Sequence, residues 1–144
     1  MRALLDANFL IALLDSNHTF HKRAQSWATD NISGGWASCP LTENAFVRIM
    51  SNPNYSRERR FSISDLTHLL ADFIQKKDHQ FWPDDISILD DSLFVTDKIH
   101  GPRQLTDLYL LALAAKNHGR LVTFDQGIPL SAVRGATDEN LCVV

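Results

Sequence analysis

Four carboxylates occupy positions in this chain where a carboxylate is costly unless it shares a cation. They are Asp6, Glu43, Asp107 and Asp125. Asp6 directly follows the apolar run 3–5, and Asp125 directly follows the apolar run 121–124. An unpaired buried carboxylate loses its hydration and must be neutralised by a cation or a proton. Four such acids, spread over almost the whole chain, therefore predict a divalent-metal site at one end of a sheet.

Glu43 and Asp107 project from the apolar faces of expected helices. At helical spacings of three, four and seven residues, Asp107 shares a face with Leu110, Leu111 and Ala114. At the same spacings, Glu43 shares a face with Phe46, Val47 and Met50. A helix-capping acid normally leans towards solvent, whereas these two lean towards the core. We therefore expect them to meet the other acids.

Each of the four acids also has a purely structural explanation. Asp6 could cap a helix that begins at Ala7, and Asp125 could open a turn before Gly127. Asp107 and Glu43 lie in first turns, where a negative charge is favourable to the helix dipole. Helix caps are far commoner than metal ligands. For each acid considered alone, the structural role therefore remains an alternative to metal binding.

The apolar pattern predicts short strands that alternate with helices. Expected strands are 3–5, 35–38, 86–88, 121–124 and 141–144. Expected helices are 7–14, 19–29, 40–50, 62–77, a short one at 91–95, and 106–118, the last capped by Thr106 and ended by Gly119. This order predicts one α/β domain over residues 1–144, with a short, mainly parallel central sheet flanked by helices on both faces. Ligands of such sheets bind beyond the carboxyl ends of the strands, where Asp6 and Asp125 fall.

Composition narrows the class of protein. The chain has 144 residues, of which 44% are hydrophobic, and no apolar run approaches the roughly 20 residues of a membrane span. Cys39 and Cys142 have neither metal-site nor disulfide-framework spacing, so we expect a cytoplasmic protein with reduced thiols and no membrane association. The formal net charge of −3 argues against a strongly basic nucleic-acid binder. Any nucleic acid would be held by local basic patches and by metal ions.

The residue types indicate which cation to expect. Oxygen ligands without cysteine or a histidine pair favour Mg²⁺ or Mn²⁺ over zinc. Magnesium keeps several waters, which leaves room for phosphate oxygens, and such a site suits phosphodiester hydrolysis because the metal activates water and stabilises the leaving oxygen. Asn8 could add an amide or make only a local hydrogen bond. Thr106 and Thr123 are candidate supporting hydroxyls.

Four stretches, taken in order, resemble the PIN-domain ribonucleases, and in particular the VapC-type toxins of bacterial toxin–antitoxin pairs. They are Leu5-Asp6-Ala7-Asn8, Thr42-Glu43-Asn44 with Arg48 one turn on, Leu105-Thr106-Asp107-Leu108-Tyr109-Leu110, and Leu121-Val122-Thr123-Phe124-Asp125. Many relatives carry a further acidic or amide residue two places after the last aspartate, where this chain has Gly127.

The resemblance implies a PIN-like nuclease domain that acts as the toxin of such a pair. Asp6, Glu43, Asp107 and Asp125 would form a catalytic group that binds Mg²⁺ or Mn²⁺. The enzyme would be an endoribonuclease that hydrolyses RNA phosphodiester bonds, with transfer RNA among the expected substrates. A small cognate VapB-like antitoxin would inhibit it, and a homodimer is expected.

Basic residues offer possible contacts to RNA. The segment 52–60 mixes arginines with one aromatic residue, and it could either hold a phosphate backbone or be a solvated loop. Arg103 is a better candidate for a phosphate contact because it lies only three residues before the 106–107 pair. Arg48 could orient an acid or meet substrate. His68 and His79 are expected at the surface.

Two further functions are consistent with parts of the pattern. A haloacid-dehalogenase-like phosphatase also places an aspartate after its first strand. It has an acid two residues later, where this chain has Asn8, and a lysine where this chain offers only Arg120. A non-catalytic module that binds RNA or a partner protein would keep the same fold, although the presence of all four acids argues against it.

Overall fold

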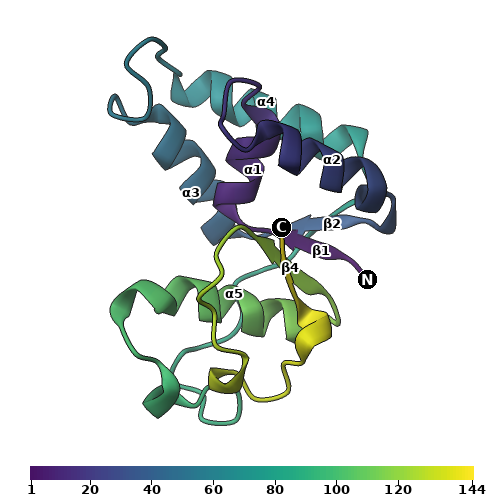
Figure 1. Cartoon of the computed structure of the whole chain (residues 1–144), viewed down its shortest axis with the longest axis vertical. Helices are drawn as coiled ribbons and strands as arrows, with labels where there is room; N and C mark the ends of the chain where they lie inside the picture. The colour runs from purple at the N-terminus through teal and green to yellow at the C-terminus, as the bar shows by residue number, and fades with distance from the viewer.

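Five short strands form one sheet at the centre of the protein, and every neighbouring pair of strands is parallel (Figure 1). The computed structural model describes all residues 1–144. The strands are β1 (Ala3–Leu5), β2 (Trp36–Ser38), β3 (His79–Phe81), β4 (Arg120–Thr123) and β5 (Leu141–Val143). Their order across the sheet is β3-β2-β1-β4-β5. The expected α/β class with a parallel central sheet is confirmed.

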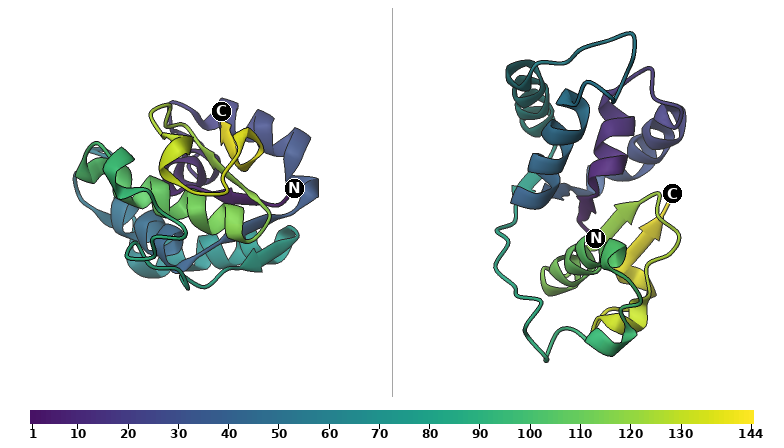
Figure 2. Two further views of the ribbon diagram at one scale, coloured as in Figure 1. Left: turned by 90° about the horizontal axis from the view of Figure 1, so that it is seen from below. Right: turned by 90° about the vertical axis from the view of Figure 1, so that its left-hand side faces the viewer.

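Helices cover both faces of the sheet, but unequally. The helices α1 (Ala7–Leu14), α2 (His21–Asn31), α3 (Pro40–Ser51) and α4 (Ile63–Lys76) gather above the sheet in Figure 1, whereas α5 (Leu105–Lys116) lies below it. Figure 2 shows the same two layers from other sides, with the long connection from β3 to α5 running down one edge. None of the helices has the length and apolar character needed to cross a membrane.

The central strand β1 separates two hydrophobic clusters, and its three residues are all buried. Ala3 and Leu5 belong to the cluster beneath α1–α4, and Leu4 belongs to the cluster around α5. Successive side chains of a strand point to opposite faces, so a strand covered on both faces reads as an unbroken apolar run. This is why the short apolar run 3–5 predicts a buried strand.

The strand order creates a switch point between β1 and β4. The strands β2 and β3 lie on one side of β1, and β4 and β5 lie on the other. In parallel sheets this arrangement opens a crevice beyond the carboxyl ends of the strands. The backbone N–H of Asp6 donates to the carbonyl of Val122 at 2.9 Å, which extends the β1–β4 pairing to the first of the predicted acids.

Two expected elements are wrong. No strand forms at 86–88 and no helix forms at 91–95; the remaining strand is β3, and a short 3₁₀ helix follows at Thr96–Lys98. β3 pairs only with β2 at the edge of the sheet, and its side chains are mostly exposed, so it lacks the apolar run of the inner strands. Ile86 and Ile88 pack against the α5 cluster from an irregular segment, and apolar character alone did not distinguish them from a strand.

The two ends of α5 also differ from expectation. Thr106 lies inside the first turn and is not the cap. After the last turn, His118 rather than Gly119 adopts the left-handed backbone conformation, with a φ of 55°. Gly119 is required for a different reason, which is close packing. A Cβ atom there would lie 2.7 Å from the carbonyl oxygen of Arg2 and 2.7 Å from the ring of Trp82.

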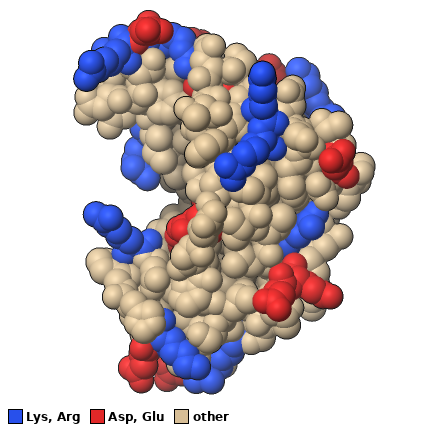
Figure 3. Space-filling model, in the orientation of Figure 1, with Lys and Arg blue, Asp and Glu red and all other residues tan.

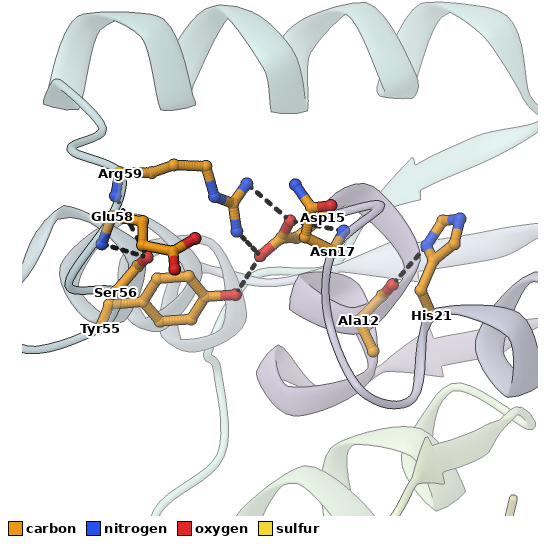
Figure 4. A network of polar contacts seen from close by, with 8 residues as sticks. All are labelled: Ala12, Asp15, Asn17, His21, Tyr55, Ser56, Glu58 and Arg59. Carbon is orange, nitrogen blue, oxygen red and sulfur yellow. Dashed lines mark hydrogen bonds and ion pairs between the residues drawn. The ribbon is translucent and has the colours of Figure 1, made fainter.

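A buried carboxylate anchors the loop between α3 and α4 (Figure 4). Asp15, which follows α1, accepts two hydrogen bonds of 3.0 Å from the guanidinium of Arg59 and one of 2.5 Å from the hydroxyl of Tyr55. Burial opposes the charge, but these bonds outweigh it and lower the pKa of Asp15 to about 2. Arg59 and Tyr55 were possible RNA contacts in the sequence; they hold segment 52–60 to the fold.

We expect Asp15→Asn to destabilise the protein by about 2 kcal/mol at pH 7, because it removes the charge from a buried bidentate ion pair. The pKa of Asp15 is lower in the folded protein than in the unfolded chain. The stabilisation is therefore complete above about pH 4 and is lost as the pH falls towards 2. Urea unfolding at pH 7 and pH 3 measures this difference.

The matched control for this substitution is Asp30→Asn, at an exposed position of α2, which should leave stability unchanged at both pH values. A loss of stability in Asp15→Asn that is equally large at pH 7 and pH 3 would contradict the role assigned to the charge.

Candidate functional site

Asp6 is held at the carboxyl end of β1 by its own helix and by the neighbouring strand. It is the N-cap of α1, and one carboxylate oxygen accepts a 2.7 Å hydrogen bond from the backbone N–H of Ala7. The other oxygen accepts a 2.7 Å bond from the hydroxyl of Thr123. Asp6 is only 8% exposed, and burial raises its pKa despite these two bonds. Asp6 therefore caps α1 and also lies in an acidic cluster.

Asp107 and Asp125 bring two more carboxyl groups to the same edge of the sheet. Asp107 lies in the first turn of α5, and Asp125 follows β4. Burial, the hydrogen bond to Asp125 and the charge of Asp6 together raise the pKa of Asp107 to about 7. The pKa of Asp125 is lowered because its carboxylate accepts that hydrogen bond. Two close carboxyl groups without a cation between them favour one proton for the pair, which accounts for the opposite directions of the two pKa shifts.

The hydroxyl of Thr123 links the acids to one another. It donates to Asp6, and it accepts a 3.1 Å bond from the backbone N–H of Asp125 and a 3.3 Å bond from the amide of Asn8. Asp125 in turn accepts a 2.9 Å bond from the backbone N–H of Gly127, so the turn expected there is present. Thr123 therefore contacts the acids directly, and Asn8 reaches them only through Thr123.

Glu43 has a hydrogen-bond partner that the other three acids do not share. It is in the first turn of α3. Its carboxylate accepts a 2.6 Å hydrogen bond from the hydroxyl of Ser38, which is also 2.8 Å from Nε2 of His79. The structure thus brings three of the four predicted acids together and leaves Glu43 on a separate hydrogen-bonded chain.

His79 and Ser38 are contacts of this site that the sequence did not reveal. The expected surface position of His79 is wrong, because the ring is half-buried against Trp36, with ring centroids 4.4 Å apart. Burial, followed by the charge of Arg2, lowers the pKa of His79. Ser38 ends β2 at the carboxyl edge of the sheet, and that position was a usable signal. Nothing in the sequence marks His79.

A cavity of about 600 Å³ opens between α3 and the N-terminal ends of α4 and α5. Its lining includes Asn44, Arg48 and Thr106, each of which is next to, or one turn from, a predicted acid. Figure 3 shows a notch in the surface with acidic atoms at its base and basic side chains on both sides. Arg48 and Arg103 are exposed, and neither takes part in an ion pair. Their charges are therefore available to a ligand.

Comparison with known proteins decides the family. The family model described as "PIN domain" matches residues 3–134, a stretch that contains β1 to β4 and all four predicted acids. The chain belongs to the PIN-domain family. The resemblance that the sequence motifs carry is confirmed.

Several curated proteins of Mycobacterium tuberculosis are similar to this PIN domain. Ribonuclease VapC44 is 48% identical over 144 residues, the whole of both chains. Ribonuclease VapC39 is 41% identical over 138 residues, which are 96% of this chain and 99% of that protein. Ribonuclease VapC38 is 43% identical over 126 residues, which are 88% of this chain and 86% of that protein. This PIN domain is therefore of the VapC type.

The acids of this PIN domain fit a divalent cation that takes few protein ligands. No three His, Cys, Asp or Glu side chains are arranged to ligate one ion together. Asp107 and Asp125 nevertheless lie against each other, which raises the pKa of Asp107, and neither has a Lys, Arg or His partner in an ion pair. In the metal-free protein a proton between the two carboxyl groups would offset their repulsion. A divalent cation would replace that proton, and Mg²⁺ usually combines only one or two carboxylates with waters. The donor atoms are all oxygens, which favours Mg²⁺ or Mn²⁺.

We expect the metal-free protein to lose stability as the pH rises from about 4 to about 7. The pKa of Asp107 is raised in the folded state, so the folded protein keeps a proton that the unfolded chain has released. That advantage is lost as the pH rises to the raised pKa. Asp107→Asn keeps a neutral group beside Asp125 at every pH. In EDTA at pH 8 its melting temperature should exceed that of wild type by a few degrees, a modest gain because the pair is open to water.

Thermal unfolding followed by circular dichroism between pH 4 and pH 8 measures this difference, which should shrink towards the acid end. A variant that is less stable than wild type at pH 8 would contradict the proton-sharing arrangement.

Proposed function

We propose that this chain is a Mg²⁺- or Mn²⁺-dependent endoribonuclease that hydrolyses phosphodiester bonds of RNA. The observation that carries the proposal is the crowding of Asp6, Asp107 and Asp125 at the switch point of a PIN-domain sheet, where the pKa values of Asp6 and Asp107 are raised and no basic side chain pairs with the acids. RNA is itself a polyanion, so such a cluster can act on it only when a cation offsets the carboxylate charge. The similar proteins are named ribonucleases, which supports RNA as the substrate class.

Each acid has a role that follows from its position. Asp6, Asp107 and Asp125 would hold the cation directly or through waters, with Thr123 fixing the orientation of Asp6. When bound, the metal lowers the pKa of a water molecule and stabilises the charge that develops during in-line displacement. At present the carboxylate of Glu43 is hydrogen-bonded to Ser38 of β2. To bind the cation with the other three acids, the Glu43 side chain would turn away from Ser38 and towards the cavity.

The cavity beside the acids would receive the RNA backbone. Arg48 and Arg103 are exposed and without ion-pair partners, and a guanidinium can bind a phosphate through two hydrogen bonds. The net charge of −3 gives no general attraction for RNA, so these local charges would supply it. Thr106 and Asn44 line the same cavity and offer polar groups to the sugar or base.

We further propose that the enzyme is the toxin of a toxin–antitoxin pair, is cytoplasmic, and acts as a homodimer. Its expected inhibitor is a small VapB-like antitoxin, and transfer RNA is among its expected substrates. The support is the similarity to Ribonuclease VapC44 over the whole of both chains. The match to the PIN domain gives no support to a haloacid-dehalogenase-like phosphatase. A non-catalytic binding module would have the same fold, and the experiments below distinguish it from a nuclease.

We expect Asp6→Asn and Asp107→Asn each to reduce RNA cleavage by at least about 100-fold, because each removes a charge that the cation requires. The assay follows cleavage of bulk transfer RNA by purified protein in Mg²⁺, in Mn²⁺ or in EDTA. Wild type should cleave with either metal and remain inactive in EDTA. Asp30→Asn, exposed on α2 away from the acids, should cleave like wild type.

If pure Asp6→Asn or Asp107→Asn protein cleaved RNA as fast as wild type, the assignment of these acids to the catalytic metal site would be wrong. Titration calorimetry with Mn²⁺ tests the non-catalytic alternative independently of RNA. Binding that Asp107→Asn weakens supports the enzyme, and no detectable binding to wild type supports the non-catalytic module.

Expression of the wild-type chain in a bacterial host should arrest growth, because uncontrolled RNA cleavage stops translation. Asp107→Asn should not arrest growth. Co-expression of the small protein encoded beside the gene should restore growth to wild-type expressing cells. Growth arrest that persists in Asp107→Asn would show that the toxicity does not come from the acidic site.

A further inference from the structure

An aromatic and basic cluster lies at the carboxyl end of β4 and makes no contact that is part of the acidic cluster. Phe124, the residue before Asp125, packs against Phe20 with ring centroids 5.2 Å apart. The guanidinium of Arg23 lies over both rings, 4.9 Å from the centroid of Phe20 and 5.2 Å from that of Phe124. We call Phe20, Phe124 and Arg23 the aromatic platform. It joins the N-terminal end of α2 to the end of β4.

Phe20 does not stabilise the helix that follows it. It is the N-cap of α2, a position where a Ser, Thr, Asp or Asn side chain would accept a backbone N–H, and its ring makes no such bond. Nor is the ring fully buried, since Phe20 is 41% exposed. An exposed ring at a capping position gives up a helix cap without the full gain of apolar burial. A ligand that covers the ring would offset both losses.

From this geometry we propose that the aromatic platform is a stacking subsite for a nucleobase of the RNA strand that is cleaved. The proposal rests on the proposed nuclease function. Aromatic rings that stack on bases, together with arginine, are the features by which proteins hold single-stranded nucleic acid without reading its sequence. Phe124 follows Thr123, whose hydroxyl donates to Asp6, so the platform and the acids lie at the same carboxyl edge of the sheet. The stacked base would belong to the RNA strand that passes the acids at this edge.

The subsite implies that the cleaved segment is unpaired. A base inside a duplex is stacked on its neighbours and reaches a side-chain platform only when it is splayed out. Every base has a π-face, so the platform should show little base preference. Arg23 places a guanidinium over the two rings, and the same guanidinium donates to the terminal carboxyl group of Val144. Figure 3 shows basic side chains on the same face of the molecule as the acidic notch, so the charges there favour a nucleic acid.

Binding of a fluorescein-labelled single-stranded oligoribonucleotide, on the order of ten nucleotides long, tests the subsite. EDTA prevents cleavage, so the readout does not depend on the metal. Phe20→Leu keeps an apolar side chain but removes the π-face, and it should raise Kd by about 10-fold, which is within the range for one stacked base. Phe20→Tyr keeps the π-face and should bind like wild type.

The matched control is Phe81→Leu, which removes an exposed ring from the edge strand β3 and should leave Kd unchanged. Oligoribonucleotides with one abasic position each connect the loss to a base. Removing the base at one position should weaken binding to wild type, and removing the same base should not weaken binding to Phe20→Leu any further, because the stacking contact is already lost. The proposal would be overturned if Phe20→Leu had the Kd of wild type. It would also be overturned if the abasic position and Phe20→Leu each reduced affinity and their effects simply added.

Other results separate this inference from the proposed function. If wild type and Phe20→Leu bind and cleave RNA equally, the nuclease stands and the stacking subsite is overturned. If Phe20→Leu binds RNA normally but escapes the antitoxin, the platform is a protein-binding surface and the stacking subsite is again overturned. If wild type neither binds the oligoribonucleotide nor cleaves transfer RNA, both proposals fail.

Discussion

The parallel pairing of β1 with β4 is the constraint on which the rest of the structure depends. Leu5 lies opposite Val122, and the backbone N–H of Asp6 continues the pairing one residue further. This register places Thr123 where its hydroxyl reaches the carboxylate of Asp6. A shift of one residue would exchange the two faces of the central strand, moving Leu4 into the other cluster and breaking that contact. The packing of the core and the geometry of the acids are therefore set by the same few hydrogen bonds.

Two carboxylates of this protein show that the groups around a carboxylate, rather than burial alone, decide whether its pKa is lowered or raised. Asp15 is buried but receives a bidentate bond from Arg59, so its pKa falls to about 2 and its charge is structural. Asp107 is less buried but faces only other acids, so its pKa rises to about 7. The fold neutralises the first charge and leaves the second for something outside the chain. This contrast within one domain is the strongest physical argument for a cation at the edge of the sheet.

The parts of this fold that could be predicted are those with a local signal. Inner strands such as 3–5 are unbroken apolar runs because both faces are covered, and the acids that follow two of these runs necessarily lie at one edge of a parallel sheet. The edge strand β3 has no such run, because one side of an edge strand meets solvent. The place of Glu43 and the role of Arg59 depend on partners 5 and 44 residues away in the sequence, Ser38 and Asp15. Side-chain pairing of this kind leaves no periodic pattern.

The last residue of the chain completes the sheet at the edge that carries the acids. The backbone N–H of Val144 donates to the carbonyl of Thr123 at 3.0 Å, and Arg23 donates to the terminal carboxyl group of Val144. Figure 1 shows this terminus close to β4, whereas Met1 precedes β1 at its amino end. An affinity tag placed after Val144 would therefore emerge beside Asp125 and the aromatic platform, and it would compete with any ligand of either. A tag placed before Met1 would leave the molecule from the opposite edge of the sheet, so the choice of tag decides whether the purified protein presents its acidic edge unobstructed.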